Sequence, residues 1–384
     1  MRYEALDSIC KVAAGGTPSR SKTEYWEDGS IPWIKIGNIK SKYVSEADEY
    51  ITESGLNNSS AKLFAKGTIL YTIFATLGEV GILDMAACTN QAIAGISIEK
   101  SKLMTTDYLY YYLKSKKAEV NQMGRGVAQN NINLSILRKF SIPVRDQNEQ
   151  ERIVETLNHI EAVIENKKTE LANLDNLIKA RFVEMFKGKY DSFKVDEKLK
   201  TTSGGTPKSS VSEYYDGGDI PWLTSGEVNY GGITKPSNYI TEKGLNNSSA
   251  KWVPENSIVI AMYGATAGKV GIVRYKTTTN QAVCSILPND NFNQEFLRYA
   301  FQDISEELTS KAIGGGQPNI SQTIIKNSYI VDAPIEEQER FASFAKQIDK
   351  SKFVLSNELT MCDFYIRLIH DRVMHGRINL RVTQ

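Results

Sequence analysis

The chain repeats itself, and this repeat limits its possible folds more than any other feature. The segment ITESGLNNSSAK at 51–62 returns as ITEKGLNNSSAK at 240–251, with eleven of twelve residues identical. GGTPSRSKTEYWEDGSIPW (15–33) returns as GGTPKSSVSEYYDGGDIPW (204–222), and TNQA (89–92) returns at 279–282. The offset stays between 188 and 190 positions. A constant offset over the whole chain predicts two homologous modules of about 190 residues.

The composition is that of a globular protein. Hydrophobic residues make up 41% and charged residues 24% of the chain, which is enough for sizeable cores. No apolar run is long enough to span a membrane, and the N-terminal residues lack the apolar stretch of a signal peptide. The four cysteines have unrelated spacings and the three histidines do not cluster. We therefore expect a cytoplasmic protein with free thiols and no metal site.

The first segment of each module is predicted to fold as an α/β domain. Residues 1–144 and 188–334 are rich in Gly, Asn, Ser and Thr between short β-branched runs, which indicates strands joined by loops. One amphipathic helix interrupts each segment. The apolar faces of these helices are Tyr108, Leu109, Tyr112 and Leu113 in the first module and Phe296, Leu297, Ala300 and Phe301 in the second.

The second segment of each module, 145–187 or 335–384, carries apolar residues spaced alternately four and three positions apart. This heptad pattern predicts a coiled-coil helix, interrupted in its seam by Lys167, Arg181 and Lys352. Each segment ends at a glycine, Gly188 or Gly376, as helices commonly do. The predicted seam residues are Ile153, Leu157, Ile160, Ile164, Leu171, Leu174, Ile178, Ile348, Leu355, Leu359, Ile366 and Ile369.

These patterns predict an α+β fold with two homologous mixed α/β domains separated by a long antiparallel two-helix coiled coil. If the halves are related by a pseudo-twofold axis, the helices must run antiparallel and can bury their seams against each other. The alternative is that each helix packs only on its own domain. The length of the heptad pattern favours the coiled coil.

The sequence offers no catalytic motif. GATAGK (264–269) is one residue short of a phosphate loop, Val270 follows it instead of Ser or Thr, and the counterpart of Lys269 is Glu79. A GxSxG elbow, an HExxH helix, a GxGxxG opening a βαβ unit and an NPPF-like methyltransferase tetrapeptide are also missing from the sequence. We therefore expect a non-catalytic binding protein.

The loops carry many side chains that could contact DNA. Asn, Gln, Ser and Thr read base edges and hold phosphates, and Arg and Lys bind both. The same polar residues also make turns and helix caps, and for the Asn pair of GLNNSSAK both interpretations stay open. We expect the segments that differ between the two modules to be those that recognise different DNA sequences. The candidate contacts are Arg20, Lys22, Lys35, Asn38, Asn57, Asn58, Asn90, Gln91, Arg125, Gln129, Lys208, Thr224, Ser225, Asn246, Asn247, Lys269, Asn280, Gln281 and Gln317.

In their fixed order these motifs resemble the specificity subunits of type I restriction–modification enzymes. The resemblance rests on GGTPS, IPWI, ATLGEVGI and TNQA, and on a proline before Glu-Gln at the start of each heptad helix (SIPVRDQNEQERI and VDAPIEEQERF). It covers essentially the whole chain. The family usually has a proline pair before Glu-Gln, whereas each half here keeps one proline, Pro143 or Pro334.

The resemblance implies two target recognition domains (1–144 and 188–334), each reading one half of a bipartite, asymmetric DNA site. It implies that the long helices (145–187 and 335–384) set the spacer and dock two modification (methyltransferase) subunits, with restriction (translocase and endonuclease) subunits in the full complex. S-adenosylmethionine, ATP and Mg would be bound by these partners and no cofactor by this chain.

The net charge of the chain is only +1. Non-specific binding to DNA depends on an excess of positive charge, so we expect the chain alone to bind DNA weakly. Two other functions stay open. One is an autonomous nuclease–methyltransferase fusion, which labelled S-adenosylmethionine would reveal. The other is a scaffold that binds no nucleic acid, which a gel shift with and without a methyltransferase partner would identify.

Overall fold

The structure is a computed structural model that describes residues 2–124, 131–312 and 319–370. The chain divides into two compact units: unit 1, residues 1–168 with 357–384, and unit 2, residues 169–356. Each unit holds one α/β block together with the start of one long helix and the end of the other. The boundaries between the two compact units therefore fall in the middle of both long helices. The boundaries predicted from the sequence fall instead where each α/β block meets its helix.

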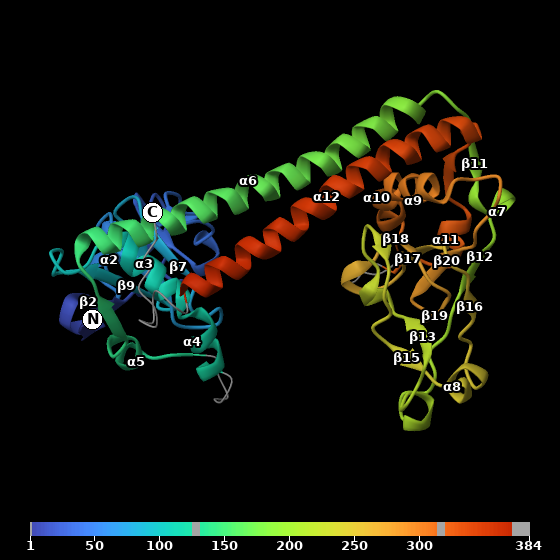
Figure 1. The fold of residues 1–384 in the computed structure, drawn as a ribbon. Coiled ribbons are helices and arrows are strands. Elements are labelled where there is room, and N and C mark those ends of the chain that lie inside the picture. Colours follow the sequence, from blue (N-terminus) through green and yellow to red (C-terminus); the bar gives the residue numbers. More distant parts are fainter. Residues whose placement is uncertain (1, 125–130, 313–318, 371–384) are drawn as a thin grey trace. The chain divides into compact units, whose positions relative to one another are not determined.

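Unit 1 is built on a five-stranded sheet, a three-stranded sheet and a two-stranded ladder (Figure 1). Its strands are β1 (Arg2–Ala5), β2 (Cys10–Ala14), β3 (Ile31–Ile34), β4 (Tyr43–Val44), β5 (Glu49–Ile51), β6 (Ile69–Thr72), β7 (Val80–Leu83), β8 (Cys88–Thr89), β9 (Ile93–Ile98) and β10 (Ser141–Val144). The strand orders are β2-β9-β6-β7-β4, β5-β3-β8 and β1-β10. Its helices and 3-10 turns are α1 (Leu6–Ile9), η1 (Thr23–Tyr25), η2 (Ile36–Asn38), α2 (Glu53–Asn57), α3 (Thr106–Ser115), α4 (Lys117–Gly124), α5 (Leu134–Arg138) and the start of α6 (Gln147–Phe186).

Over the described residues, unit 2 repeats this order of elements and adds one strand, β16 (Trp252–Val253), and one 3-10 turn, η5 (Gly264–Thr266). Its strands are β11 (Ser192–Lys194), β12 (Thr201–Ser203), β13 (Ile220–Leu223), β14 (Gly232–Ile233), β15 (Tyr239–Ile240), β16 (Trp252–Val253), β17 (Ile258–Ala261), β18 (Val270–Val273), β19 (Thr277–Thr279), β20 (Val283–Ile286) and β21 (Tyr329–Val331). The strand orders are β12-β20-β17-β18-β14, β15-β13-β19-β16 and β11-β21. Its helices and 3-10 turns are α7 (Val195–Lys198), η3 (Ser212–Tyr214), η4 (Ser225–Glu227), α8 (Glu242–Asn246), η5 (Gly264–Thr266), α9 (Gln294–Asp303), α10 (Ser305–Ser310), α11 (Gln322–Lys326) and the start of α12 (Ile335–Ile369).

The two units pair equivalent strands in the same way. In both, the five-stranded sheet has one parallel pair, β4 with β7 or β14 with β18, and the small sheet pairs β3 with β8 or β13 with β19 in parallel. The other strand pairs in both sheets are antiparallel. Two homologous mixed α/β folds are therefore confirmed.

The amphipathic helices α3 and α9 lie where the sequence predicts them and form the core of each unit. The predicted apolar faces of both helices are buried against the large sheet. The Thr105 side chain caps α3 by accepting from the Tyr108 amide, and Asn293 caps α9 at Phe296. Capping satisfies amides that a helix start otherwise leaves without a partner.

The repeated Glu-Gln motif joins each long helix to its unit. Gln150 and Gln338 are almost fully buried at the starts of α6 and α12. The Gln150 side chain accepts from the Thr105 amide at 2.9 Å, and Gln338 accepts from the Asn293 amide at 2.9 Å. Each glutamine therefore ties the first turn of a long helix to the first turn of the neighbouring core helix.

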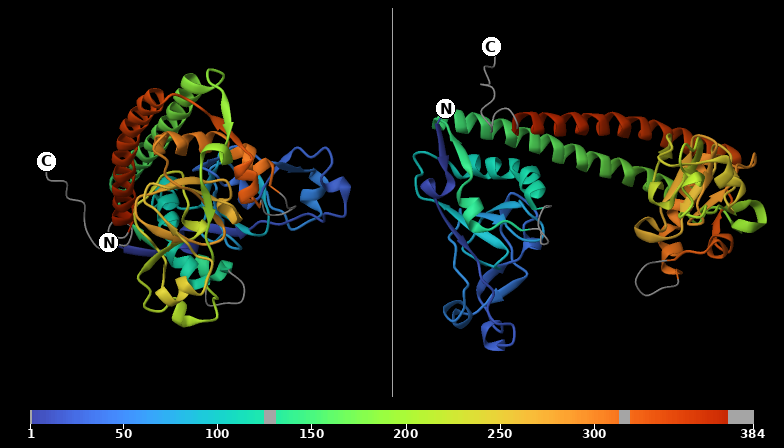
Figure 2. Two further views of the ribbon diagram at one scale, coloured as in Figure 1. Left: turned by 90° about the vertical axis from the view of Figure 1, so that its right-hand side faces the viewer. Right: turned by 90° about the horizontal axis from the view of Figure 1, so that it is seen from below.

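The long helices α6 and α12 run antiparallel and side by side in both units (Figures 1 and 2). All twelve predicted seam residues are buried or half-buried. The lysines that interrupt the seam form ion pairs with the opposite helix, Lys167 with Glu358 in unit 1 and Lys352 with Asp175 in unit 2. These two interruptions are thus compensated across the helix pair, whereas Arg181 pairs with Glu184 of its own helix.

The ends of the long helices also pack on the α/β blocks, and α6 packs on the blocks of both units, so the alternative that each helix packs only on its own domain is wrong. Ile153 and Leu157 join the core of unit 1, while Ile178 joins the core of unit 2. In unit 2 the rings of Phe182 and Phe341, from α6 and α12, lie 5.3 Å apart. Helix α6 ends at Phe186, and Gly188 follows with a positive φ of 72°, as predicted. Gly376 lies outside the described residues.

Within residues 2–124, 131–312 and 319–370, no helix combines the length and apolar character that a membrane crossing requires. The four cysteines are free, and three of them are buried. Burial raises the pKa of the Cys10 thiol to about 12 and that of Cys284 to about 12, so these thiols stay protonated at neutral pH.

Candidate nucleic-acid interface

Three of the repeated motifs meet at one place in each unit. The glycines of GGTP approach the backbone of TNQA and of SSAK so closely that a side chain would not fit. A Cβ on Gly15 would lie 2.1 Å from Thr89 Oγ1, and one on Gly16 would lie 2.3 Å from the carbonyl carbon of Ser60. In unit 2, Gly204 meets Thr279 and Gly205 meets Ser249 in the same way. These motifs recur because they pack against one another.

The segment at 51–62, and its copy at 240–251, forms the support of this packing. Thr52 accepts from the Gly55 amide at 3.0 Å, which caps α2, and donates to the Glu24 carbonyl at 2.9 Å. Thr241 does the same for α8 and the Glu213 carbonyl. A Cβ on Gly55 would lie 2.7 Å from the Tyr25 carbonyl oxygen. This segment therefore holds the loop that contains η1 or η3.

Four of the asparagines that recur in both units make hydrogen bonds within the chain. The Asn58 amide donates to the Ser54 carbonyl at 3.0 Å, and Asn247 donates to the Lys243 carbonyl at 2.8 Å, which closes the ends of α2 and α8. The side chains of Asn90 and Asn280 accept from the amides of Ala92 and Ala282 and so form turns. Asn57 and Asn246 are the exposed last residues of α2 and α8. DNA contact by these six residues stays a prediction.

In unit 1 the predicted residues Arg20, Lys35 and Asn38 lie together at the end of β3. Arg20 and Lys35 both pair with the Glu49 carboxylate, each at 2.5 Å. The Asn38 side chain accepts from the Lys35 amide at 2.8 Å. Hydrogen bonding from Lys35, together with Arg20, lowers the pKa of Glu49, so this carboxylate is ionised at neutral pH.

Two tryptophans complete the Arg20 site. The Arg20 guanidinium lies 3.6 Å from the ring centroid of Trp26 and 4.9 Å from that of Trp33. The Trp33 indole donates to the Gly16 carbonyl at 3.0 Å. The rings therefore link the guanidinium to the Gly-Gly packing, while about half of the Arg20 side chain, 53%, stays exposed.

Two further predicted contacts lie in the same loops of unit 1. Lys22 donates to the Tyr25 hydroxyl at 2.9 Å, which raises the pKa of the lysine, and it remains exposed. Thr17 donates to the exposed Gln91 side chain. Unit 2 repeats the second contact, from Thr206 to Gln281.

In unit 2 the equivalent cluster has different chemistry. Thr224, Glu227 and Asn238 occupy the positions of Lys35, Asn38 and Glu49. Glu227 accepts from the Thr224 amide at 2.8 Å and from the Asn238 side chain at 2.9 Å. Burial alone would raise the pKa of Glu227, but hydrogen bonds from Thr224 and Asn238 lower it. Ser225 lies in η4 and accepts from Thr266 through its carbonyl, and Lys208 is exposed in the GGTP loop.

Lys269 ends the loop between the antiparallel strands β17 and β18, and Thr266 of the same loop contacts Ser225 in the cluster. The loop does not lead from a strand into a helix of the kind that binds phosphate. Its Gly268 has a positive φ of 84°, and its carbonyl accepts from Ser305 on α10. The predictions at Arg125, Gln129 and Gln317 lie outside the described residues.

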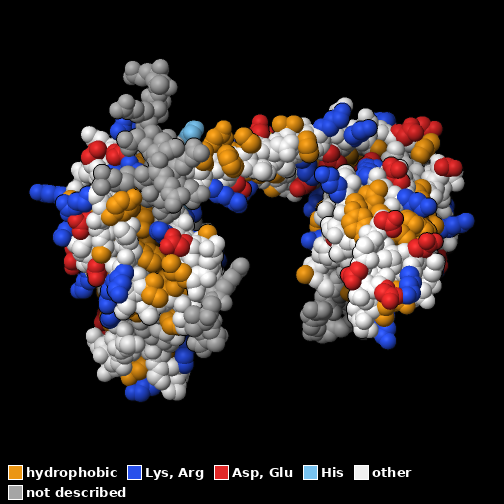
Figure 3. All heavy atoms as spheres, turned by 60° about the horizontal axis from the view of Figure 1, so that its bottom comes forward, with side chains coloured by type: hydrophobic (Ala, Val, Ile, Leu, Met, Phe, Trp, Pro, Cys, Tyr) orange, Lys and Arg blue, Asp and Glu red, His pale blue; other side chains and the backbone are white. Residues whose placement is uncertain are grey.

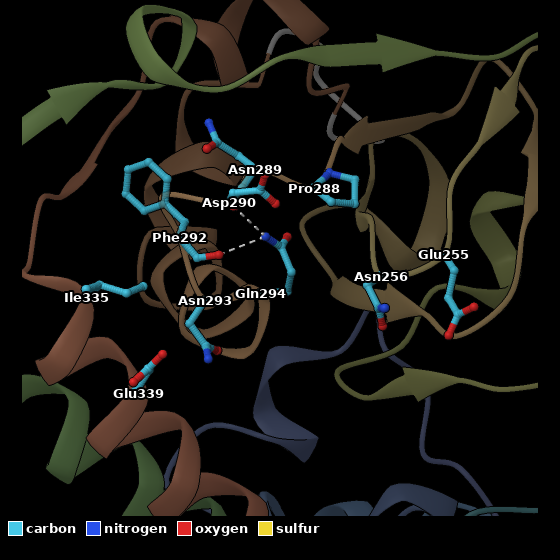
Figure 4. A pocket seen from close by; sticks show the side chains of 10 residues that line it. All are labelled: Glu255, Asn256, Pro288, Asn289, Asp290, Phe292, Asn293, Gln294, Ile335 and Glu339. Carbon is cyan, nitrogen blue, oxygen red and sulfur yellow. Dashed lines mark hydrogen bonds between the residues drawn. The ribbon is translucent and has the colours of Figure 1, made fainter.

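A pocket of about 400 Å³ in unit 2 has the wrong charge for DNA (Figure 4). It lies where α9 and α12 begin, and its lining includes the acidic residues Glu255, Asp290 and Glu339. Gln294 is turned inward, where its amide donates to the carbonyls of Asn289 and Phe292. Carboxylates repel phosphate, so this pocket does not belong to a nucleic-acid surface.

Sequence reasoning missed the residues that organise the two clusters. Glu49 and Trp26 hold Arg20 in unit 1, and Glu227 and Asn238 organise unit 2. The available signal was the difference between aligned repeats, since Glu49 aligns with Asn238 and Asn38 with Glu227. A carboxylate changes position between two otherwise matched segments.

Known proteins resemble this chain in sequence and in fold. The family model described as the type I restriction modification DNA specificity domain matches twice, at residues 2–176 and 187–360. The MjaIX specificity subunit of Methanocaldococcus jannaschii is 27% identical over 91% of this chain and 88% of its own length. The S subunit of a type I restriction–modification system from M. genitalium has a similar fold, with a TM-score of 0.53 and 15% identity over 97% of this chain and 95% of the other.

A second solved structure, from work on assembly and conformational transition of the type I R-M system, has a TM-score of 0.63 at 14% identity and covers 98% of both chains. The two matched regions of the family model include most of the chain. The protein therefore belongs to the family of type I restriction–modification DNA specificity proteins. It is a specificity subunit, the non-catalytic component that carries the DNA specificity domains.

The close approach at Gly16 gives a testable prediction. Gly16→Ala should destabilise unit 1 by about 1–3 kcal/mol, because the added Cβ meets the backbone at Ser60. Gly37→Ala is the matched control, since a Cβ there meets nothing within 4 Å and the residue lies beside the same cluster. Hydrogen exchange of the segments around residues 16, 60 and 89 measures the effect. Equal protection in the two variants would contradict the packing role.

Proposed function

We propose that each unit reads one half of a bipartite, asymmetric DNA site, so that the two halves of the chain recognise different sequences. The observation that carries this proposal is the contrast between the units. Their glycine packing, threonine caps and strand pairing match, while the polar cluster at the end of β3 or β13 differs. Two domains that recognise different DNA sequences need different hydrogen-bonding groups, and here these groups are held by the same backbone packing in both units.

The charge of the chain limits how the complex binds DNA. The net charge is +1, and in unit 1 the cluster cations Arg20 and Lys35 already pair with the Glu49 carboxylate. Counterion release from phosphates therefore contributes little to the affinity of this chain alone. We propose that partner subunits neutralise most of the phosphates and that this chain contributes mainly specificity.

We also propose that the antiparallel helices set the spacer between the half-sites and dock two methyltransferase subunits, with restriction subunits joining the full complex. The exposed apolar residues of α12 support a docking role: Phe353 and Val354 in unit 2, and Met361, Phe364 and Tyr365 in unit 1, are 49% to 68% exposed. Hydrophobic side chains are visible on the surface of the long helices (Figure 3). Exposed apolar groups on an otherwise polar helix are common at protein interfaces.

The reactive chemistry then belongs to the partners. We propose that they bind S-adenosylmethionine, ATP and Mg, and that the assembled complex acts on double-stranded DNA in the cytoplasm. This division is supported by the lack of catalytic motifs in the sequence.

The modular proposal is tested by exchanging residues 1–144 for the corresponding block of another specificity subunit. The chain is expressed with its methyltransferase partner, and methylated adenines are mapped by single-molecule sequencing. We expect one half-site to change and the other to stay the same. Simultaneous change of both half-sites would contradict independent reading by the two units.

The spacer proposal is tested by lengthening both helices by one heptad. Residues 162–168 and 357–363 face each other, as the Lys167–Glu358 ion pair indicates, so duplicating both segments preserves the seam. Seven residues add about 10 Å of helix, or about three base pairs at about 3.4 Å each. Methylation mapping should therefore show the same half-sites with a longer spacer. An unchanged spacer in a folded, active variant would refute the proposal.

A further inference from the structure

Arg20 distinguishes the cluster of unit 1 from that of unit 2. Arg20 belongs to a loop in which Gly16, Thr17 and Pro18 are shared with unit 2, but its counterpart there is Ser209. Lys35 is likewise replaced by Thr224. The cationic part of the cluster therefore exists in unit 1 and is absent at the equivalent described positions of unit 2.

The surroundings of Arg20 fix its orientation before any ligand binds. Glu49 pairs with one side of the guanidinium at 2.5 Å, and the Trp26 ring lies against its face at 3.6 Å. Trp26 is itself held, because its indole donates to the Ser19 carbonyl at 3.1 Å and its ring meets Trp33 edge-on at 5.0 Å. A guanidinium held on a ring and by a carboxylate loses little freedom when it binds.

The carboxylate argues for a base and against a phosphate as the ligand. Glu49 lies between two cations, so the three charged groups together carry one net positive charge. An ionised carboxylate next to a phosphate is repulsive, whereas the edge of a neutral base meets no such penalty. Among the bases, guanine presents O6 and N7 as paired acceptors in the major groove, which matches the two parallel donors of arginine.

We infer that Arg20 reads a guanine in the half-site of unit 1, that Glu49 and Trp26 are its positioning residues, and that unit 2 reads a different base at the equivalent place. This inference rests on the proposed function. It assigns a base to one side chain and a supporting role to two residues that do not themselves contact DNA.

Unit 2 shows what replaces the arginine. Its carboxylate, Glu227, is occupied by donors of the same unit, Thr224, Asn238 and the Ser237 amide at 3.1 Å. Tyr215 takes the place of Trp26, with its ring 6.0 Å from that of Trp222. The cluster of unit 2 thus has a similar support and no guanidinium.

The test uses the full chain with its methyltransferase partner in a host without adenine methylation, followed by single-molecule mapping of methylated sites. The variants are Arg20→Ser, which copies unit 2, and Arg20→Lys, which keeps the charge but loses the paired donors. Both should relax one guanine position in one half-site by about 5- to 150-fold, as expected for the loss of one bidentate contact. The other half-site should not change.

Positioning residues are tested by Glu49→Gln and Trp26→Phe, which should relax the same position to a smaller extent. A merely structural role would lower methylation at all sites without relaxing one position. Lys66→Ala is the control, because Lys66 is an exposed lysine of unit 1 that pairs with Asp84 at 2.7 Å, outside the cluster. It should leave the methylated motif unchanged.

The outcomes separate the inference from the proposed function. A wild-type complex without a bipartite motif would refute the proposed function itself. A bipartite motif that Arg20→Ser and Arg20→Lys leave unchanged would overturn only the inference. Uniform loss of methylation in Arg20→Ser with full activity in Arg20→Lys would also overturn it, since that result identifies a phosphate contact.

Discussion

The close approach of backbone segments at the Gly-Gly pairs is the constraint on which the recognition surface depends. Gly15 and Gly16, like Gly204 and Gly205, let three loops from distant parts of each unit touch without a side chain between them. The indole of Trp33 or Trp222 then donates to the carbonyl of the second glycine, at 3.0 or 3.1 Å. Through this contact the backbone packing that both units share determines where the polar groups that differ between the units lie.

The long helices solve a different problem, which is to join two such surfaces in one chain. Each helix begins on one unit, where a buried glutamine ties it to a core helix, and ends on the other unit. Equivalent acids on the two helices, Glu161 and Asp349, hold the core helices through different partners, Lys114 at 2.5 Å and Arg298 at 3.0 Å. Both units therefore keep an ion pair between the long helix and the core helix, but with different residues. The polar clusters at β3 and β13 likewise occupy equivalent positions with different residues.

Local patterns in the sequence were sufficient to predict the repeat, the heptad helices and the core helices. The seam residues and the apolar faces of α3 and α9 follow from periodicity, and both are buried as predicted. The roles of Asn58 and Asn90 could not be assigned in this way, since a cap and a DNA contact use the same side chain. Glu49 escaped prediction because its partners, Arg20 and Lys35, lie on other segments that only the folded sheet brings together.

The most direct measurement of the central claim is the methylation map of a chain that carries residues 1–144 in both positions, with 188–334 replaced. If two related readers act independently on a common support, this chain with its methyltransferase partner should modify a site that contains the half-site of unit 1 twice. A folded complex that still modifies the original asymmetric site, or a site containing neither half, would contradict the account.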